Sequence, residues 1–565
     1  MAKKKPVKKK QSIKRVKAKP VTKTLFQKIE EFLENRHHII ALVITGLSLI
    51  LALMMFDAKI SMGLDDSTYI EQGFKYSNDF WNHYFTAQAP FYAMFLALPI
   101  KLFGINLVLI KMINVIFFVA SVYIFYRAFR FRIGWFILFS ALVIYATNTE
   151  ALRMASLTYT EALYLFIQSI FLYVGIRVIE RLDNKKSIVE NLKSNWLILL
   201  VLSVIFYFLF LTRTVGIATF AIFIVFYIFK KQYKLGLVVG TVMGLVYVAL
   251  GALKGMIWES TNQFSTQAKI LSQKDAYDAS QGYEDFSGFI ERVLDNTNQF
   301  FSSRFFEILG LREYPSEWNW GLAFFILIPL IWSLIRAFKK NNYAIAFAVL
   351  YVGAICAFSF LGMQKSWGQA RYIMILLAPI FLGVFWLLTE WFSKENSKGY
   401  QFFALIIMLF FVLVNFGNSF KIAQNNIPIA RANLIKGDMY KGFTPDWVNF
   451  LKLSKWCGDS LSDNELVASR KAPMSFIYSN GKEFHPIWST TPNPDPDSTL
   501  ASWKKNGITH VILGNLRVNA KTSQAGIINT VHRILQPIQN KYPEKLVMVR
   551  KEGEYEESVL IKIDY

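Results

Sequence analysis

The chain of 565 residues is 54% hydrophobic and 16% aromatic, has a mean hydropathy of +0.32 and carries a formal net charge of +23. Only 18% of its residues are charged, against about a quarter in an average soluble domain, so much of its apolar surface must face something other than water. These values exclude a disordered chain, a collagen-like chain and a disulfide scaffold. The two cysteines, Cys356 and Cys457, supply neither a disulfide framework nor a Cys-rich metal site.

The positive charge is concentrated at the N-terminus. Residues 1–37 contain thirteen Lys or Arg and three Glu, a net charge of +10. Such a tail binds anionic lipid, binds nucleic acid or stays solvated. Because an apolar run follows directly, we interpret it as a cytoplasmic tail at a membrane surface and expect no nucleic-acid partner. It lacks the short apolar core and cleavage site of a secretory signal, so we expect it to be retained.

Eleven apolar runs approach the length that a membrane span requires, which is about 20 residues for a hydrocarbon core of about 30 Å. They lie at 39–56, 105–126, 133–147, 158–176, 195–212, 215–229, 235–253, 320–335, 342–361, 372–391 and 401–419. A further run at 90–103 is too short and contains Pro99 and Lys101, so we interpret it as an interfacial or re-entrant helix. The sequence therefore predicts a polytopic α-helical membrane protein with about 11 transmembrane helices, whose membrane domain covers residues 38–421.

The basic residues predict the orientation of these helices, because short cytoplasmic loops carry an excess of Lys and Arg. With the N-terminus inside, sixteen such residues fall in five short loops on one side. They are Arg127, Arg130, Arg132, Arg177, Arg181, Lys185, Lys186, Lys193, Lys230, Lys231, Lys234, Arg336, Lys339, Lys340, Lys394 and Lys398. The opposite side has the longer segments 57–104 and 256–318, the second with ten acidic and five basic residues. We therefore place both segments and the C-terminus outside, and expect a bacterial inner (plasma) membrane.

The region after the last span has the composition of a soluble domain. Within residues 440–565, helix-like and strand-like segments alternate. The helix-like segments are 446–456, 498–507 and 526–542, and the strand-like segments are 465–469, 510–515, 545–549 and 558–563. This alternation predicts a small outer α/β domain.

Glycines recur every fourth residue between 235 and 255. Gly236, Gly240 and Gly244 share one helix face, and Gly251 and Gly255 repeat the spacing. Small residues let helix backbones approach closely in lipid, so we expect tight helix packing here, with a hinge as the alternative.

An acidic pair follows the first span. Asp65 and Asp66 begin a helix-like stretch in which Tyr69 falls one turn after Asp65. One interpretation is structural, because Asp66 or Ser67 suits a helix N-cap and carboxylates are favoured at the positive end of a helix. The other interpretation is catalytic, and the surrounding motifs bear on it.

Several short motifs together resemble one family. They are Gly63 to Tyr69 (GLDDSTY), Ala89 to Tyr92 (APFY), Phe103-Gly104, Leu157 to Glu161 (LTYTE), Leu211 to Gly216 (LTRTVG) and Arg371-Tyr372 followed by Pro379. Their order and common side resemble the membrane-embedded type C glycosyltransferases, in particular the branch with the protein O-mannosyltransferases and the aminoarabinose transferases of lipid A. The resemblance covers about residues 38–392. Glu161 stands where several relatives have Asp.

The resemblance implies transfer of a hexose or pentose from a polyprenyl-phosphate donor to a protein, glycan or lipid acceptor on the outer side. Such a reaction needs a carboxylate as general base for the acceptor hydroxyl. It also needs positive charge where the leaving phosphate develops its negative charge, which Arg or a bound metal supplies. One carboxylate and one or two Arg on one face are therefore the minimum set.

We expect Asp65 to be the base, with Asp66 as its competitor or its orienting neighbour. Glu161 is expected to orient the acceptor, to pair with an Arg or to join a metal site, unless it only favours a helix N-terminus. Arg371 is the leading candidate for the donor phosphate, against a snorkelling role at a span end. For Arg213, donor binding and a structural ion pair remain equal alternatives.

The remaining candidates are less specific. Tyr372 either contacts the donor or is an interfacial aromatic, and Tyr69 and His83 are candidates for orienting the acceptor, although a lone exposed His is more often incidental. Arg153 and Lys365 are weaker candidates on the same face. A divalent metal held by Asp65 and Glu161 is compatible with the sequence but not required by it.

Two other functions share features with this sequence, and one motif resembles a metal site. A lipid-linked-sugar transporter or flippase would share the many spans, but such proteins usually carry ionisable groups near the bilayer midplane. Here the charged residues lie almost entirely at span ends, and Lys111, about one and a half helical turns into a span, is the nearest exception. A membrane-anchored binding protein leaves the spans unexplained. Asp495-Pro-Asp497 has the spacing of a nucleotide-sugar metal site, but its Pro-rich surroundings indicate a turn.

Overall fold

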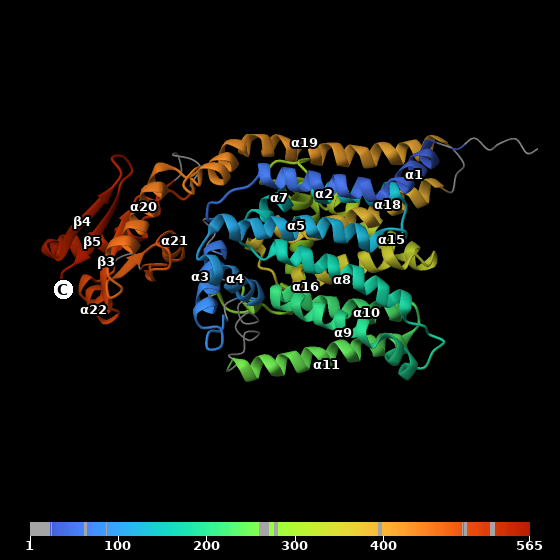
Figure 1. Cartoon of the computed structure of the whole chain (residues 1–565), viewed down its shortest axis with the longest axis horizontal. Coiled ribbons are helices and arrows are strands. Elements are labelled where there is room, and N and C mark those ends of the chain that lie inside the picture. Colours follow the sequence, from blue (N-terminus) through green and yellow to red (C-terminus); the bar gives the residue numbers. More distant parts are fainter. Residues whose placement is uncertain are drawn as a thin grey trace, which may run out of the picture.

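The computed structural model describes residue 23 and residues 25–61, 65–85, 88–258, 271–275, 281–393, 398–488, 490, 494–519 and 526–565. Most of the basic tail predicted at 1–37, and Gly63 and Leu64 of the first motif, lie outside the described residues. The chain forms a bundle of long helices with a smaller domain at one end (Figure 1). Helix α1 (Leu25–Asn35) lies at the other end of the bundle.

The bundle is built from long helices joined by short ones. The long helices are α2 (His37–Met54), α5 (Leu107–Phe129), α8 (Glu161–Arg181), α9 (Ile188–Thr212), α11 (Tyr233–Ile257), α15 (Trp320–Lys339), α16 (Tyr343–Gly362), α18 (Leu377–Ser393) and α19 (Lys398–Lys436). The shorter ones are α3 (Asp65–Asn78), α4 (Phe91–Phe103), α6 (Trp135–Ala146), α7 (Thr149–Ala155), η1 (Thr214–Ile217), α10 (Ala218–Phe229), α13 (Phe286–Asn298), η3 (Gln299–Arg304), α14 (Phe305–Ile308), η4 (Lys365–Trp367) and α17 (Arg371–Met374).

Every one of the eleven predicted runs is helical, but the count of eleven spans is not confirmed. Among the described residues, eight helices are long and apolar enough to cross a membrane, or nine if the pair α6 and α7 counts as one bent span. Helices α10 and α18 are apolar but short, as is α4, which occupies the run predicted to be interfacial or re-entrant. The protein is an integral membrane protein. Gly104, with φ of 67°, ends α4 at the predicted Phe-Gly motif.

The predicted span at 133–147 is broken by polar side chains. Helices α6 and α7 meet at 54°, and Asn148 between them caps α7 by accepting from the backbone N–H groups of Glu150 (3.1 Å) and Ala151 (3.2 Å). Asn148 Nδ2 also donates to Asn415 Oδ1 of α19 at 2.9 Å. Inserted polar groups of this kind explain the sharp bend.

Helix α19 extends well past the span predicted to end at residue 419. It continues to Lys436 and runs along the length of the bundle toward the C-terminal domain (Figure 1). Asn426 on this extension donates from Nδ2 to the carbonyl oxygens of Met54 (3.1 Å) and Phe56 (3.0 Å) at the end of α2. The predicted span ended where the apolar run ends, whereas the helix continues because packing on α2 stabilises its polar half.

The predicted glycine packing holds for only part of α11. A Cβ on Gly236 would lie 3.2 Å from Tyr227 Cβ of α10, and one on Gly240 would lie 3.8 Å from Ile224. Added Cβ atoms on Gly244, Gly251 and Gly255 would meet no described atom within 4 Å. Close packing is therefore limited to the first turns of the helix, and the prediction was wrong for the last three glycines.

The C-terminal domain is a five-stranded mixed sheet with helices on both faces. Its elements are α20 (Pro445–Ser460), β1 (Leu466–Ser469), α21 (Ala472–Tyr478), β2 (Phe484–Pro486), α22 (Pro496–Lys505), β3 (Ile508–Gly514), α23 (Thr530–Lys541), η5 (Pro543–Lys545), β4 (Leu546–Glu552) and β5 (Ser558–Ile563), with strand order β2-β1-β3-β5-β4. All four predicted strands and three predicted helices are present. Strand β2 and helix α21, which are only three and seven residues long, were not predicted.

Asp495 and Asp497 begin a helix rather than a turn. Asp495 Oδ2 accepts from the backbone N–H of Ser498 at 2.8 Å and so caps α22. Asp497 accepts from Lys541 (2.6 Å) and from the hydroxyl of Tyr542 (2.7 Å) on the neighbouring helix. The predicted turn was wrong because Pro496 occupies the first helical position, which favours a helix start.

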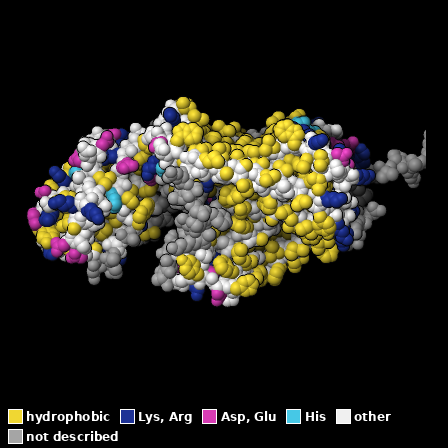
Figure 2. All heavy atoms as spheres, turned by 90° about the horizontal axis from the view of Figure 1, so that it is seen from below, with side chains coloured by type: hydrophobic (Ala, Val, Ile, Leu, Met, Phe, Trp, Pro, Cys, Tyr) yellow, Lys and Arg dark blue, Asp and Glu magenta, His cyan; other side chains and the backbone are white. Residues whose placement is uncertain are grey.

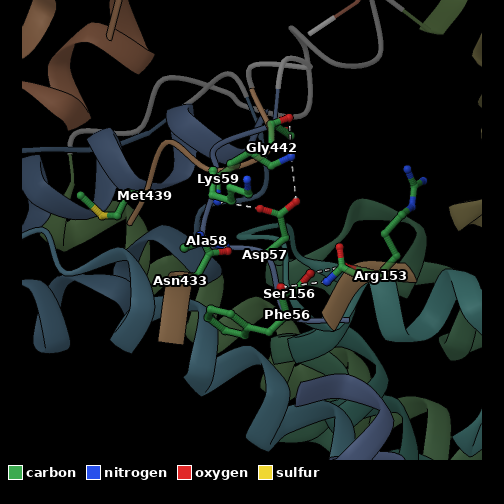
Figure 3. A network of polar contacts seen from close by, with 12 residues as sticks. Phe56, Asp57, Ala58, Lys59, Arg153, Ser156, Asn433, Met439 and Gly442 are labelled. Atoms are coloured by element: carbon green, nitrogen blue, oxygen red, sulfur yellow. Dashed lines mark hydrogen bonds and ion pairs between the residues drawn. The ribbon is translucent and has the colours of Figure 1, made fainter. Parts of the chain in front are cut away.

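The segment after α2 makes polar contacts with α19 and with the start of the C-terminal domain. Figure 3 shows this junction, where Lys59 Nζ donates to the carbonyl of Gly442 (3.2 Å) and lies 3.1 Å from Asp57 Oδ2. The backbone N–H of Ala58 donates to Asn433 Oδ1 of α19 at 2.9 Å. These contacts tie the segment after α2 to α19 and to the domain that follows it.

The surface agrees with a bundle in lipid. Figure 2 shows hydrophobic side chains over the flank of the bundle, with Lys and Arg gathered at the end away from the C-terminal domain. Exposed apolar residues of the bundle include Leu237 of α11, Ile331 of α15 and Leu413 of α19. Within the bundle, the positive charge therefore lies mainly at one end of the helices, as is typical of a bundle that spans a membrane.

Candidate active site

A cavity of about 480 Å³ opens at the end of the bundle that carries α3 and α4. Its walls come from α3, the segment before α4, the start of α8, the turn between α9 and η1, the end of α16, η4 and α17. The polar lining residues are Asp65, Tyr69, Gln88, Thr160, Thr212, Arg213, Thr214, Ser359, Gln369, Arg371 and Tyr372. Five of the predicted motifs, far apart in the sequence, thus meet in one place.

Asp65 lies on the cavity wall in contact with Arg371. Its Oδ2 is 3.1 Å from Arg371 Nη2, and its Oδ1 accepts from Gln88 Nε2 at 3.2 Å. The Asp65 side chain is 31% exposed. Among the described lining residues it is the only carboxylate.

Arg371 and Arg213 share a second carboxylate behind the wall. Glu161 is fully buried at the start of α8, where Oε1 pairs with Arg213 Nη1 and lies 3.6 Å from Arg371 Nη1. Both guanidinium groups lie 5.3 Å from the ring of Tyr372, and that of Arg371 lies 4.9 Å from the ring of Tyr159. The four ions thus form a chain in which two carboxylates alternate with two guanidinium groups.

Asp66 faces away from this cavity. It is fully buried and accepts from the backbone N–H groups of Ser61 and Thr158, both at 2.9 Å, while Lys111 Nζ of α5 lies 3.4 Å from its Oδ2. Burial raises the pKa of Asp66, and the charge of Lys111 and the two backbone donors oppose this rise. Asp66 therefore anchors α3 against α5 and the segment before α8.

The two candidates for acceptor contact are separated in space. Tyr69 lines the cavity and packs edge-on against Tyr92 (5.4 Å between ring centroids), and burial raises the pKa of its hydroxyl. His83 lies outside the cavity, where its Nε2 is 2.8 Å from Gln72 Oε1. It lines a different groove of about 360 Å³ between α3 and the C-terminal domain.

A row of hydrogen-bonded side chains inside the bundle holds the segment that follows the cavity residues Arg371 and Tyr372. The hydroxyls of Tyr164 and Tyr351 are 3.0 Å apart, and Tyr351 donates to Gln168 Oε1 at 2.8 Å. Gln168 Nε2 in turn donates to the carbonyl oxygen of Ile375 at 2.9 Å, where α17 gives way to α18. The residues that follow Arg371 and Tyr372 are thereby held by a side chain of α8.

Comparison with solved structures gives the fold. The archaeal oligosaccharyltransferase of Archaeoglobus fulgidus, tethered with an acceptor peptide, matches 86% of this chain and 70% of its own at a TM-score of 0.51 and 11% identity. The same enzyme, AglB, with an inhibitory peptide and dolichol-phosphate, gives 0.51 and 11% over 85% and 70%. ArnT of Cupriavidus metallidurans bound to undecaprenyl phosphate matches 92% and 97% at 0.53 and 12%. The chain has the type C glycosyltransferase fold. No family model and no curated protein matches the chain in sequence.

Within the type C fold, several site residues escaped the sequence analysis. Gln88 precedes the Ala89-Pro90 motif, and Tyr159 and Thr160 stand inside the LTYTE motif. The one sequence feature that could have identified these three residues is their position within or beside the motifs. Arg153 and Lys365 do not line the cavity, since Arg153 pairs with Glu150 (2.8 Å) and Lys365 pairs with acidic residues of α13.

A divalent metal does not fit the donor set of this type C site. The described residues contain no group of three or more His, Cys, Asp or Glu side chains placed to hold one. Arg371 also contacts both candidate ligands, Asp65 and Glu161. A dication between these carboxylates would therefore lie against a guanidinium group.

Proposed function

We propose that this protein is an inverting glycosyltransferase that moves a sugar from a polyprenyl-phosphate donor to an acceptor on the outer face of the membrane. The observation that carries this proposal is the contact of Asp65 with Arg371 in the cavity wall, because it brings a base and a phosphate ligand together. The fold agrees, since ArnT and AglB structures with this fold hold undecaprenyl phosphate and dolichol-phosphate.

The two arginines are the proposed ligands of the donor phosphate. A phosphate leaving group is a weak base and needs positive charge rather than a general acid. Arg371 and Arg213 offer planar guanidinium groups suited to phosphate oxygens, and both line the cavity. Tyr372, between the two guanidinium groups, is proposed to fix their planes.

Asp65 is the proposed general base. As the acceptor oxygen or nitrogen attacks the anomeric carbon, its proton passes to Asp65 and the bond from that carbon to the phosphate oxygen breaks, releasing polyprenyl phosphate. Attack opposite the leaving group inverts the anomeric configuration. A bound donor phosphate competes with Asp65 for Arg371, and a carboxylate less engaged by a guanidinium group is a stronger base.

Glu161 and Asp66 are proposed to position these groups. Glu161 is paired to both arginines and is buried out of the cavity, so it holds them apart at the spacing that the phosphate requires. Asp66 holds the first turn of α3, and therefore Asp65, through Ser61, Thr158 and Lys111. Tyr69 is the proposed contact for the acceptor.

We assign the N-terminus to the cytoplasm and the C-terminal domain to the outside of a bacterial inner membrane. The basic loops at the end away from the C-terminal domain support this orientation (Figure 2). The cavity then faces outward beside that domain, where an acceptor protein, glycan or lipid reaches it.

A reconstituted assay separates this function from that of a transporter or flippase. Purified protein in vesicles receives a panel of radiolabelled polyprenyl-phosphate sugars and candidate acceptors, and free polyprenyl phosphate is measured. The proposal predicts protein-dependent release together with a glycosylated acceptor. Movement of intact donor across the bilayer without cleavage would instead identify a transporter.

A further inference from the structure

One edge of the C-terminal sheet has the geometry of a ligand crevice. Strands β1 and β3 run parallel, with Ala468 opposite Val511. The chain leaves β1 through α21 to β2 on one side, and then reaches β3 on the other side through α22. Such a reversal opens a crevice at the carboxyl ends of the strands, which is where open α/β sheets bind ligands.

Two polar side chains that follow the strands, and one from α23, are assigned to one face of this edge. Ala468 and Val511 both belong to the small core formed with α22 and α23. Arg470 directly follows β1, two residues beyond Ala468, and Asn515 directly follows β3, four residues beyond Val511. Continuing the strand alternation by one residue assigns both to that same face. Asn515 faces α23, because the Nε2 atom of His532 on that helix lies 2.8 Å from Asn515 Oδ1.

The Arg470 side chain is half-buried there and has no counter-charge among the described residues. Its Nε and Nη1 atoms are inaccessible to solvent and have no hydrogen-bond partner in the part of the chain that the structure describes. Burial lowers its pKa. Burial, followed by the charge of Arg470, also lowers the pKa of the neighbouring Lys471 to about 8. A buried cation without a partner is costly, because its lost hydration is not replaced.

His532 adds an acceptor on the same face. Its Nδ1 is buried and has no hydrogen-bond partner among the described residues. Burial lowers the pKa of His532, which favours the neutral imidazole. With Nε2 donating to Asn515 Oδ1, the neutral ring leaves Nδ1 free to accept a hydroxyl hydrogen.

We propose that this edge is a second binding site, in which Arg470 holds the phosphate or carboxylate group of a hydroxylated anion and His532 accepts one of its hydroxyls. Guanidinium groups bind both kinds of anion through paired hydrogen bonds. An acidic carbohydrate has this chemistry. The site lies in the C-terminal domain, outside the cavity of Asp65, and does not depend on the proposed transferase activity.

Hydrogen–deuterium exchange of the full-length protein in detergent tests this site locally. The probes are glycerol 1-phosphate and glucuronate, with sodium chloride at equal ionic strength as reference. We expect at least one probe to slow exchange at least twofold in peptides covering 466–478, and the stronger probe assigns the anionic group. Arg470→Met removes the effect, whereas Arg533→Met, at an exposed arginine of α23, retains it.

A stability measurement guards against misfolding of the variant. Because Arg470 is unpaired, Arg470→Met unfolds in chloride at the same temperature as the parent protein or higher, and loses the stabilisation that the probe gives the parent. A lower unfolding temperature would mean that Arg470 has a structural partner and would overturn the proposal. Absence of protection by both probes, or protection that survives Arg470→Met, would overturn it equally.

Discussion

At the scale of single residues, the two neighbouring aspartates have different surroundings. Asp65 is partly exposed on the cavity wall, whereas Asp66 is fully buried beside Lys111. The sequence placed both at the start of a helix and favoured Asp65 as the base, but it did not predict that Asp66 is buried. Their difference arises from contacts with residues 61, 111 and 158, which local pattern does not reveal.

Lys111→Met tests the buried ion pair. Removing one partner of such a pair costs about 3–5 kcal/mol of unfolding free energy at neutral pH. The pKa of Asp66 is already raised by burial, and the loss of Lys111 raises it further. The folded variant then holds a proton that the unfolded chain releases above pH ~4.

The stability of this variant should therefore fall as the pH rises from about 4, so the deficit relative to the parent is smaller at pH 5 than at pH 8. Thermal unfolding in detergent at the two pH values measures it. Lys101→Met, at an exposed lysine of α4, is the matched control. A deficit that is independent of pH would show that Lys111 does not act through Asp66.

Arg371→Lys tests the proposed phosphate ligand. Lysine keeps the charge but loses the planar group that contacts Asp65 and Glu161 together. We expect polyprenyl phosphate to bind about tenfold more weakly, a loss of about 1.4 kcal/mol. Titration of the purified variant measures this, with Arg153→Lys, outside the cavity, as control. Equal affinities of the parent and Arg371→Lys would remove Arg371 as a ligand.

At the scale of elements, the break between α17 and α18 aims Arg371 and Tyr372 into the cavity. Gln168→Leu removes the hydrogen bond to the Ile375 carbonyl that holds this break. We expect kcat to fall about three- to tenfold with KM for the donor little changed, since misplacement of a positioned group slows the chemical step. Tyr173→Phe on the same helix should leave both constants unaltered. A change in KM alone would argue against a positioning role.

The elements also show what the sequence predicts and what it does not. The apolar runs located every long helix, and the α/β alternation located four strands, because both follow from residue patterns within one segment. The bend at Asn148 depends on Asn415, 267 residues away, and the extension of α19 depends on the end of α2. Glycine spacing likewise predicted packing for Gly244, where no described neighbour approaches. Long-range contacts decide such features.

At the scale of the whole molecule, the cavity lies at the end of the bundle beside the C-terminal domain. One hydrophobic core runs from the bundle into the side of that domain formed by α20 and α21. Phe74 of α3 packs against Phe476 of α21, with 5.3 Å between their ring centroids. Helix α3 therefore contacts the domain along the same element that carries Asp65. Under the proposed function, an acceptor bound by the domain lies close to Asp65, the proposed base.

Cysteine labelling tests the orientation of the whole molecule. Both native cysteines are buried, so single substitutions at exposed lysines report sidedness in intact cells. Lys505→Cys in the C-terminal domain should react with a membrane-impermeant maleimide from outside, and Lys339→Cys should react only after the cells are opened. The reverse pattern would invert the proposed topology.

The central claim is that Asp65 removes the acceptor proton. The most direct measurement is the single-turnover rate of sugar transfer by Asp65→Asn, which keeps the shape of the side chain but removes its basicity. A general base contributes about 10²- to 10⁴-fold, so we expect a loss of that size with unfolding temperature and donor binding retained. Glu71→Gln, on the same helix, should transfer at the parental rate. A rate for Asp65→Asn within a few fold of the parent would contradict the mechanism.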